Sequence, residues 1–415
     1  MDYRVSPRKA AVAQTLISRQ LLREEAPLVG VIDMDALGLV VGSLQRAFPA
    51  HFSHAFAAKA NPMPRILEFI RAAGMACEVA SPHEFAAAVD AGFDPQDIVF
   101  DSPAKTRPEL RGALARGTVL YVDNFQELAR VDELVPITRS SATIGIRINP
   151  QVGAGTITST STASATSKFG IALRDPGNRD ALIAAFAARP WLSSLHVHVG
   201  SQGCPLELAV EGVRAVVDLA MSINAACGQH RIHTLDIGGG LPVNFTSDTV
   251  GPTFENYATL LRETVPQLFD GSVRVITEFG RSVIAKAGFM LARVEYTKLM
   301  GTRRIAITHA GAQVAARTVY QPEVWPLRIS ALDGEGRPKH DTLVAQDIAG
   351  PCCFAGDILA HHRTLPLLEP DDHVLIHDTG GYYFSSPYIY NSLPPIDAFS
   401  VTGPDDDLQV AELRI

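Results

Sequence analysis

A single lysine stands in a stretch of small apolar residues, AFAAKANP, at residues 55–62. An ammonium group is costly to remove from water, so a lysine in such a segment either reaches solvent or acts as a reactive amine. A lysine amine forms Schiff bases with carbonyl compounds. Lys59 is therefore the first candidate for covalent chemistry.

Further polar residues and glycines follow three apolar segments later in the chain. They are His198 and Ser201, then Gly238, Gly239 and Gly240, and finally Glu278, Gly280 and Arg281. The backbone N–H groups of a glycine run, beside a serine and an arginine, can converge on a phosphate group. One glycine run alone is a weak signal, but its combination with Ser201 and Arg281 in this order predicts a phosphate site.

A lysine that faces a phosphate site suggests a cofactor with both an aldehyde and a phosphate, such as pyridoxal 5′-phosphate. Lys59 would hold it as a Schiff base, while the glycines, Ser201 and Arg281 hold the phosphate. Glu278 would keep the pyridine nitrogen protonated and make the ring a strong electron sink. The pattern predicts a reaction through a stabilised carbanion, with Lys59 buried for the cofactor. A local ion pair between Glu278 and Arg281 is the alternative.

Two histidines, His196 and His198, alternate along one apolar run and therefore share a face, which would also suit a metal site. In the sequence, no further His, Asp or Glu cluster at the expected strand ends completes a ligand set. We therefore expect no metal. We expect His198 to stack on the cofactor ring and His196 to be a core residue or to support the site from behind.

The elements that must position these residues alternate between short β-rich runs and helical patterns such as PRILEFIRAAG. Eight runs are expected to be strands: 52–60, 76–80, 97–101, 118–123, 143–150, 194–200, 234–240 and 274–280. Their even spacing predicts an α/β fold, a (β/α)8 TIM barrel whose active site lies at the carboxyl ends of the strands. A doubly wound open sheet is the alternative.

The pattern changes after Arg281, where strand-like segments are separated by Gly, Pro and Asp turns. The sequence predicts a barrel over residues 40–283 and a C-terminal β-rich domain over 284–415, completed by the N-terminal segment 1–39. The Ser- and Thr-rich stretch 153–167 is expected to be a mobile surface loop, either a plain connection or a lid over the site.

Composition narrows the class of protein and of partner. A chain of 415 residues that is 47% hydrophobic and 19% charged has room for two domains with their own cores. Its formal net charge of −8 argues against a nucleic-acid partner, and no apolar run reaches the roughly 18 residues that a membrane span needs. Five cysteines, an odd number, and an N-terminus without an apolar signal stretch favour a cytoplasmic location.

Motifs across nearly the whole chain resemble those of the fold-type III pyridoxal-phosphate decarboxylases, the diaminopimelate and ornithine decarboxylase family. In the family's order they are AFAAKANP, CEVASPHE, SKFGI, HVHVGSQ, DIGGGLP, EFGR, GPCCFAGDIL and DTGGYYFSSPYIYNS. The resemblance implies an alanine racemase-like barrel with a β domain, pyridoxal 5′-phosphate as cofactor and an amino-acid substrate. It also implies a homodimer with two shared active sites.

The resemblance also implies roles for individual residues. Lys59 would be the Schiff-base lysine, His198 the residue stacked on the ring, and Glu278 the partner of the pyridine nitrogen. Tyr382 would join the residues at the phosphate, which are Ser201, Gly238, Gly239, Gly240, Gly280 and Arg281. Cys353 falls on the family's catalytic cysteine, which enters from the neighbouring subunit and donates a proton after carbon dioxide leaves. The adjacent Cys352 is expected only to pack in the core.

The sequence departs from the family pattern directly after that cysteine. Ornithine and diaminopimelate decarboxylases usually carry Asp or Glu there to meet the distal ammonium or distal stereocentre of the substrate, whereas this chain has Phe354. A second acidic contact of the family, an aspartate after a tyrosine, is matched by Gln321 after Tyr320. The loss of charged partners in a buried site disfavours a cationic substrate.

These departures predict a specialised biosynthetic substrate that lacks a free distal ammonium. Arg317 would then meet a carboxylate, as in relatives that process citryl-diamino acids in siderophore assembly, or Phe354 would line a pocket for a neutral side chain. Tyr320 and Asp357 complete the predicted substrate contacts. For Arg317 the alternative is a plain surface arginine. A standard diaminopimelate decarboxylase, or an ornithine or lysine decarboxylase, is the alternative function.

Three other classes share parts of the pattern. An amino-acid racemase of related fold would keep Lys59 and the phosphate site but typically places arginine at the pyridine nitrogen, where this chain has Glu278. A non-catalytic pyridoxal-phosphate carrier with the same barrel would usually lack the β domain, with its Cys353 and Tyr382. A metal-dependent barrel hydrolase would bind metal and show no cofactor absorbance.

Overall fold

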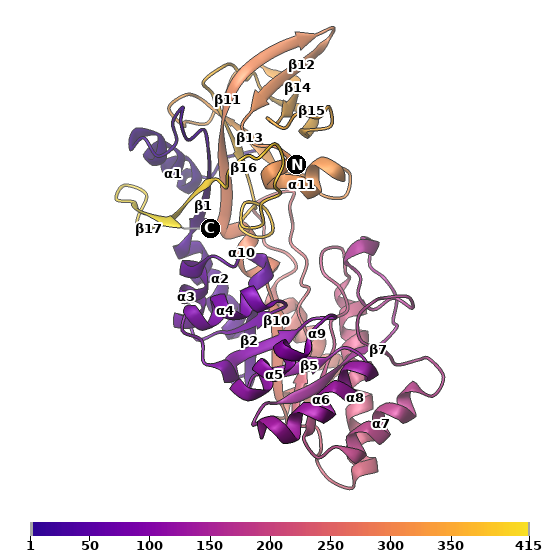
Figure 1. The fold of residues 1–415 in the computed structure, drawn as a ribbon. Helices are drawn as coiled ribbons and strands as arrows, with labels where there is room; N and C mark the ends of the chain where they lie inside the picture. The colour runs from indigo at the N-terminus through magenta and orange to yellow at the C-terminus, as the bar shows by residue number, and fades with distance from the viewer. Residues whose placement is uncertain (1–2, 414–415) are drawn as a thin grey trace. The chain divides into compact units, whose positions relative to one another are not determined.

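The computed structural model describes residues 3–413, which form two compact units (Figure 1). The first, which we call the barrel unit, comprises residues 41–243 and 251–282. The second, the β unit, comprises the other described residues: 3–40, 244–250 and 283–413. The short segment 244–250 therefore packs with the β unit, although it lies inside the range 40–283 that the sequence assigned to the barrel.

Eight parallel strands of the barrel unit pair in a closed ring. They are β2 (Phe52–Ala57), β3 (Ala76–Val79), β4 (Ile98–Asp101), β5 (Val119–Val122), β6 (Ile144–Asn149), β8 (Leu192–His196), β9 (Thr234–Asp236) and β10 (Arg274–Phe279). The closing pair aligns Glu278 of β10 with Ala55 of β2, and the short strand β7 (Ile171–Ala172) pairs only with β6. The predicted (β/α)8 barrel is confirmed, and the open sheet is excluded because β10 pairs with β2.

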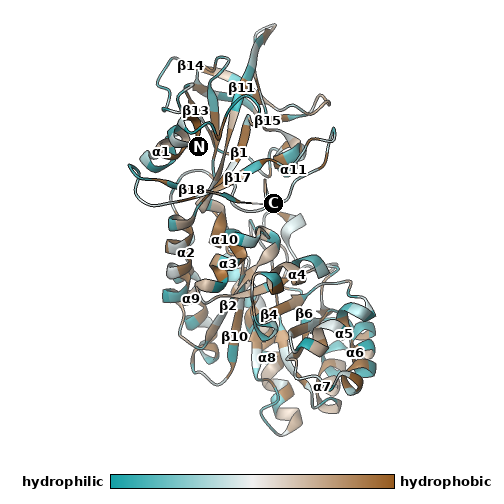
Figure 2. Cartoon of the chain, turned by 60° about the vertical axis from the view of Figure 1, so that its left-hand side comes forward, coloured by the Kyte–Doolittle hydropathy of each residue, from teal (hydrophilic) through white to brown (hydrophobic). Residues whose placement is uncertain are grey.

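Helices connect these strands, and side chains that accept backbone N–H groups mark several of their starts. They are α2 (Met34–Ala47), α3 (Pro64–Ala72), α4 (Pro82–Asp90), α5 (Arg107–Arg116), α6 (Phe125–Thr138), α7 (Asn178–Ala188), α8 (Leu206–Cys227) and α9 (Phe254–Thr264), with short 3-10 turns η1 (Ala58–Ala60), η2 (Pro95–Asp97), η3 (Thr158–Thr160) and η4 (Pro266–Phe269). Ser81 and Thr106 cap α4 and α5, as favourable N-cap residues do. Hydrophobic and hydrophilic residues alternate along α5 and α6 (Figure 2), the pattern of a helix with one face on a core. Although α8 has 22 residues, no helix within residues 3–413 is long and apolar enough to cross a membrane.

A mixed sheet forms the β unit. Its strands are β1 (Leu28–Asp33), β11 (Gly288–Met300), β12 (Arg303–Thr308), β13 (Ile329–Leu332), β14 (Leu343–Ala349), β15 (Ile358–Pro366), β16 (His373–Ile376), β17 (Asp397–Thr402) and β18 (Gln409–Leu413). β1 lies between β11, which is antiparallel to it, and β17, which is parallel. The N-terminal segment thus completes the C-terminal β domain, as the sequence predicts.

The β unit also contains helices that the sequence interpretation missed. They are α1 (Pro7–Ser18), α10 (Arg281–Ile284), which begins in the barrel unit, α11 (Ala312–Tyr320) and the turn η5 (Ala285–Ala287). Ser6 caps α1 by accepting the N–H of Lys9, and Pro7 occupies its first turn. Val12, Ala13 and Leu16 of α1 are fully buried in the apolar core of the β unit. Burial of such side chains stabilises the unit by about 1.5–3 kcal/mol for each large one.

Six charged or titratable side chains form a largely buried network in the β unit, which we call the β-unit cluster; only Asp248 among the six is exposed. They are Lys9, Asp248, Lys286, Arg328, His377 and Asp378. Lys9 Nζ lies 3.0 Å from Asp248 Oδ1 and 3.1 Å from His377 Nδ1. Arg328, whose side chain is fully buried, donates to Asp248 and lies 3.4 Å from Asp378 Oδ2. The cluster joins helix α1, segment 244–250 and the sheet.

Candidate cofactor-binding site

The predicted cofactor residues of the barrel unit gather at the carboxyl ends of its strands, where barrels carry their active sites. Lys59 lies in η1 directly after β2, and His198 lies two residues beyond the end of β8. Gly238 follows β9 closely, and Glu278 is the penultimate residue of β10. The charges of Glu278 and Lys59 both act on the pKa of His198, so the three side chains share one region of the fold.

Lys59 is paired with a buried carboxylate rather than buried itself. Its Nζ lies 2.5 Å from Oε2 of Glu78, which is 1% exposed on β3, while 46% of the Lys59 side chain is exposed. The expectation of a buried Lys59 is therefore wrong: the amine keeps access to solvent and has the Glu78 carboxyl group as its partner. Burial raises the pKa of Glu78 to about 8, against the opposing charge of Lys59. Glu78 was missed, although a glutamate inside the apolar run ACEVA could have revealed it.

His198 is held as a neutral, oriented imidazole. The Gly239 N–H donates to His198 Nδ1 at 3.1 Å, which places the ring proton on Nε2. Burial and the charge of Arg147 lower the pKa of His198 to about 3. The Thr162 hydroxyl donates to the His198 carbonyl oxygen and fixes the backbone. A neutral ring in a fixed orientation suits the predicted stacking on an aromatic cofactor.

The glycine run approaches neighbouring backbone more closely than any side chain allows. A Cβ on Gly239 would lie 2.0 Å from the Glu278 carbonyl oxygen, and a Cβ on Gly240, whose φ is +102°, would lie 1.8 Å from the Gly200 carbonyl oxygen. The N–H groups of Gly238 and Gly239 donate to Asp236 and His198, which leaves Gly240 as the backbone donor of this run for a phosphate. This side-chain-free cradle fits the phosphate of pyridoxal 5′-phosphate.

The other predicted phosphate residues lie beside this run. Ser201 is half-buried, and its N–H donates to the Thr160 carbonyl oxygen at 3.1 Å. A Cβ on Gly280 would lie 3.0 Å from the Cβ of Ala57, close to the lysine segment. Arg281 is buried at the start of α10. Contact of these three residues with phosphate stays a prediction.

The Ser- and Thr-rich stretch 153–167 is attached to the segment that carries His198 and Ser201. The Thr162 N–H donates to Val199, the Ser201 N–H to Thr160, and the Thr156 N–H to Gly203, each to a carbonyl oxygen at 2.9–3.1 Å. Backbone hydrogen bonds therefore tie this stretch to the segment that carries two predicted site residues, while its mobility and a role as a lid stay predictions. Its composition gave no sign of these hydrogen bonds, because backbone groups of any residue can make such bonds.

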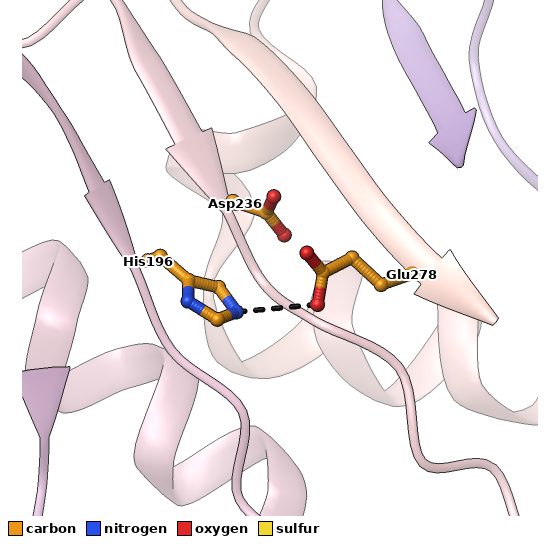
Figure 3. Close-up of side chains that lie close together, drawn as sticks. All are labelled: His196, Asp236 and Glu278. Atoms are coloured by element: carbon orange, nitrogen blue, oxygen red, sulfur yellow. Dashed lines mark ion pairs between the residues drawn. The ribbon is translucent and has the colours of Figure 1, made fainter. Parts of the chain in front are cut away.

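Three side chains from adjacent strands form a buried cluster beneath the glycine run (Figure 3). His196 projects from β8, Asp236 from β9 and Glu278 from β10, and one ligand atom of each lies within 4.8 Å of the others. His196 Nε2 and Glu278 Oε2 form an ion pair at 3.2 Å. The sequence interpretation found no cluster of this kind and placed His196 in the core or behind the site. The correction is that Asp236 and Glu278 complete a His-Asp-Glu group with His196.

Two more charged residues extend this cluster and were also missed. Arg147 of β6 donates to Asp101 of β4, and its guanidinium lies 4.4 Å from the centre of the Phe169 ring. Burial opposes ionisation of Asp101, yet the charges of Arg147 and His196 lower its pKa to about 2. We call Lys59, Glu78, Asp101, Arg147, His196, Asp236 and Glu278 together the barrel cluster.

Cys353, the predicted catalytic cysteine, lies in the β unit next to Cys352, and the two thiols have different environments. Cys353 is exposed, and its N–H donates to Asn391 Oδ1 at 2.7 Å. Cys352 is buried, and burial raises the pKa of its thiol to about 11. Both oxygens of the buried Asp357 accept backbone N–H groups, from Ala312 and Cys352, at 2.6 Å. Asp357 therefore anchors the cysteine loop, and its contact with substrate stays a prediction.

Phe354, the residue after Cys353, lies among three tyrosine rings, and we call these four rings the aromatic cluster. Phe354 stacks on Tyr320 with ring centres 5.7 Å apart and meets Tyr390 edge-on at 5.1 Å. Tyr388 completes the cluster against Tyr320 and Tyr390. A hydrogen bond with Tyr388 raises the pKa of Tyr320 to about 12. Phe354 and Tyr320, both predicted to contact substrate, thus lie together in an apolar and hydroxyl-bearing environment.

Arg317 and Tyr382, two further predicted residues, also lie together in the β unit. The exposed guanidinium of Arg317 lies 5.0 Å from the centre of the Tyr382 ring and 5.3 Å from that of Trp325. Cation–π contacts of this kind orient an arginine. Arg317 therefore has two aromatic partners although it is exposed, while its contact with substrate, and that of Tyr382 with phosphate, stay predictions.

Comparisons with known proteins extend over both units. The family described as pyridoxal-dependent decarboxylase, pyridoxal binding domain, matches residues 41–285. The diaminopimelate decarboxylase of Zymomonas mobilis is 32% identical over 356 residues, which cover 84% of this chain and 80% of that protein. That of Pseudomonas aeruginosa is 32% identical over 345 residues, covering 81% and 78%. The solved structure of Helicobacter pylori diaminopimelate decarboxylase with L-lysine has 26% identity and a TM-score of 0.83, covering 96% of this chain and 97% of that one.

Proposed function

Because the chain belongs to the pyridoxal-dependent decarboxylase family, we propose that it removes an α-carboxylate from diaminopimelate. Dependence on pyridoxal 5′-phosphate and decarboxylation of an amino acid follow from the family itself. The Zymomonas and Pseudomonas relatives and the Helicobacter structure support this substrate, since all three are diaminopimelate decarboxylases. They favour it over the specialised substrate that Phe354 alone suggests.

The observation that carries the proposal is the group of Lys59, His198 and Glu278 around the glycine run at the barrel strand ends. Lys59 would hold the cofactor aldehyde, His198 would lie against the ring, and Glu278 would meet the pyridine nitrogen. Gly240 would donate to the phosphate. When bound, the cofactor supplies an electron sink for the electron pair that remains on the α-carbon as carbon dioxide departs.

Glu78 would prepare Lys59 for this chemistry. A lysine reacts as an amine only after it loses a proton, and Glu78 Oε2, 2.5 Å from Nζ, is a carboxylate placed to accept it. Once Glu78 holds the proton, Lys59 is uncharged and nucleophilic. The same pair can later return the proton when the lysine takes part in substrate exchange.

Cys353 would supply the proton that replaces carbon dioxide at the α-carbon. Cys353 is exposed, and Asp357 anchors the loop that carries it. Both features agree with a thiol that acts on a ligand and does not pack in the core of its own subunit. We propose that the chain forms a homodimer in which Cys353 serves the barrel site of the other subunit. We also propose a cofactor-binding domain over residues 40–283 and a cytoplasmic location.

The aromatic cluster supports a second candidate, an amino-acid substrate without a free distal ammonium. Phe354 and Tyr320 stack where an acidic residue is expected after Cys353, and the four rings of the cluster carry no carboxylate. A carboxylate-rich substrate that reaches Arg317, or a neutral amino acid that packs on Phe354, would fit this surface.

A substrate panel separates the two candidates. Purified holoenzyme is offered meso-diaminopimelate, L- and D-ornithine, L- and D-lysine, apolar amino acids and a citryl-diamino acid, and products are detected by mass spectrometry. Fastest loss of carbon dioxide from diaminopimelate supports the first candidate. Reaction confined to neutral or carboxylate-rich members supports the second, and no decarboxylation of any member contradicts both.

A further inference from the structure

The buried group of His196, Asp236 and Glu278 has more hydrogen-bond acceptors than donors. Asp236 Oδ1 accepts the Gly238 N–H at 2.9 Å, but Asp236 Oδ2 and Glu278 Oε1 have no donor within residues 3–413. The two carboxyl groups point toward each other from β9 and β10 (Figure 3). Two buried carboxylates in this arrangement would repel each other and leave acceptors unsatisfied, which is costly.

A single proton between the two carboxyl groups removes both problems. We propose that Asp236 is a neutral carboxylic acid that donates a hydrogen bond to Glu278, and so positions the Glu278 carboxylate for the cofactor. Asp236 is thus a positioning residue that acts through Glu278. The inference rests on the proposed role of Glu278 at the pyridine nitrogen, but it does not depend on the identity of the amino-acid substrate.

The surroundings of the two groups place the proton on Asp236. Burial raises the pKa of Asp236 well above its usual range, and the charge of Glu278 raises it further. Burial acts on Glu278 in the same direction, but the charge and the hydrogen bond of the neighbouring His196, together with the charge of Lys59, lower the pKa of Glu278. His196 therefore supports Glu278 as a carboxylate from one side, while Asp236 supports it from the other.

Asp236 also connects the two halves of the predicted cofactor site. Its Oδ1 fixes the N–H of Gly238, the first residue of the glycine run, while its other oxygen faces Glu278. A shift of this one side chain would therefore displace both the glycine run and the acid at the pyridine nitrogen. The same three residues could alternatively bind a metal ion, in which case Asp236 would be ionised.

Two substitutions distinguish a neutral Asp236 from an ionised one. In Asp236→Asn, the amide oxygen can still accept the Gly238 N–H and the amide nitrogen can donate to Glu278, so both hydrogen bonds remain. In Asp236→Ala, both are lost. Ser194→Ala is a matched control, because Ser194 is buried on β8 and donates to the Thr234 carbonyl oxygen without belonging to the barrel cluster.

The affinity of the cofactor-stripped full-length chain for pyridoxal 5′-phosphate is titrated by absorbance, together with thermal unfolding and metal content. We expect Asp236→Asn and Ser194→Ala to stay within about 3-fold of wild type. We expect Asp236→Ala to bind about 10- to 100-fold more weakly and to shift the absorbance of the bound cofactor, as for loss of a hydrogen bond to a charged group.

Three results would overturn the inference. Unchanged cofactor affinity and absorbance in Asp236→Ala, with only a lower unfolding temperature, would show a purely structural residue. Equal damage in Asp236→Asn and Asp236→Ala would show that Asp236 acts as an anion. Stoichiometric binding of zinc to the stripped wild type, abolished by Asp236→Asn, would show a metal ligand. Since no amino-acid substrate is present, failure of the diaminopimelate proposal leaves each of these outcomes readable.

Discussion

The barrel cluster and the β-unit cluster are both largely buried charge networks, with Lys59 and Asp248 as their exposed members, but their balance of charge differs. In the barrel cluster the carboxyl groups of Glu78, Asp101, Asp236 and Glu278 outnumber the basic side chains of Lys59 and Arg147. In the β-unit cluster the cations Lys9, Lys286 and Arg328 outnumber the carboxylates Asp248 and Asp378. Where carboxyl groups are in excess in a buried site, some of them must bind protons to avoid mutual repulsion. Where lysine and arginine are in excess, the positive charges stay on these side chains.

From this difference we expect the barrel cluster to take part in catalysis and the β-unit cluster to stabilise the fold. The barrel cluster contains buried carboxyl groups whose pKa values are displaced, upward for Glu78 and downward for Asp101, beside the lysine proposed to bind the cofactor, and such shifts are common at functional sites. In the β-unit cluster, His377 is neutral, because burial and the charge of the nearby Lys9 lower its pKa to about 2. Its Nε2 forms a hydrogen bond with the Ser330 hydroxyl. We therefore expect changes in the first cluster to alter activity and changes in the second to alter stability.

The largest contrast is expected between two lysines, one from each cluster. Lys59→Met should lower decarboxylation by about 10³-fold or more and abolish the absorbance of bound cofactor, with little change in unfolding, because it removes the reactive amine. Lys9→Met should keep activity within about 3-fold but lower the free energy of unfolding by about 1–3 kcal/mol, since it leaves His377 Nδ1 without its donor and removes one of the two donors to Asp248. Steady-state rates and urea denaturation of the two variants measure this contrast, and a reversed pattern would contradict it.

Arg328 offers the strongest test of the scaffolding role. Arg328→Met removes a fully buried guanidinium and leaves Asp378 and Asp248 partly unpaired, which should lower the free energy of unfolding by about 3–5 kcal/mol. Urea denaturation measures the change. Arg337→Met is the control, because solvent screens the exposed pair of Arg337 with Asp333, so its loss should change the free energy of unfolding little. Equal effects of the two substitutions would argue against a scaffolding cluster.

A substitution in the aromatic cluster tests whether the β unit contributes to substrate recognition as well as to stability. If Phe354 faces the distal part of the substrate, Phe354→Glu should raise the preference for diaminopimelate over a neutral amino acid by about 10-fold, because a carboxylate attracts the distal ammonium. The ratio of kcat/KM values for the two substrates measures it, with Phe354→Leu as an uncharged control. No change in this ratio would remove Phe354 from the substrate site.

The rate of cofactor binding should depend on pH because of the Lys59–Glu78 pair. Because burial raises the pKa of Glu78 to about 8, Glu78 holds its own proton below that pH and cannot accept one from Lys59. The rate of cofactor binding should therefore rise by about 10-fold between about pH 7 and about pH 9. Stopped-flow absorbance measures the rate. Glu78→Gln should flatten this rise, and an identical profile in that variant would exclude Glu78 as the acceptor.

The fold was largely predictable because its signals are local. Alternating apolar runs and helical patterns identified the strands of the barrel, and the apolar run 27–35 identified β1 as part of the β domain. The helix α11 was missed because its sequence, AQVAARTVY, is short, includes β-branched residues and contains a kink at Ala315. The helix α1 was missed although Ser6 and Pro7 are good start signals.

The site was predictable only where residues stand at strand ends in recognisable order. Lys59, His198 and Glu278 were predicted this way, and the structure places all three at strand ends, while their contacts with the cofactor stay predictions. Glu78, Asp101 and Asp236 were not predicted, because each is one charged residue within or at the end of an apolar strand, and its meaning depends on a partner from a distant strand. Such pairings follow from the closure of the barrel and have no local sequence pattern.

The central claim is that the barrel cluster surrounds a lysine that binds pyridoxal 5′-phosphate covalently. Borohydride reduction of the holoenzyme followed by peptide mass spectrometry tests it most directly, since reduction fixes the cofactor to the lysine that carries it. We predict one phosphopyridoxyl adduct, on the peptide that contains Lys59. An adduct on Lys286 or another lysine, or none in a holoenzyme that still decarboxylates amino acids, would contradict the account.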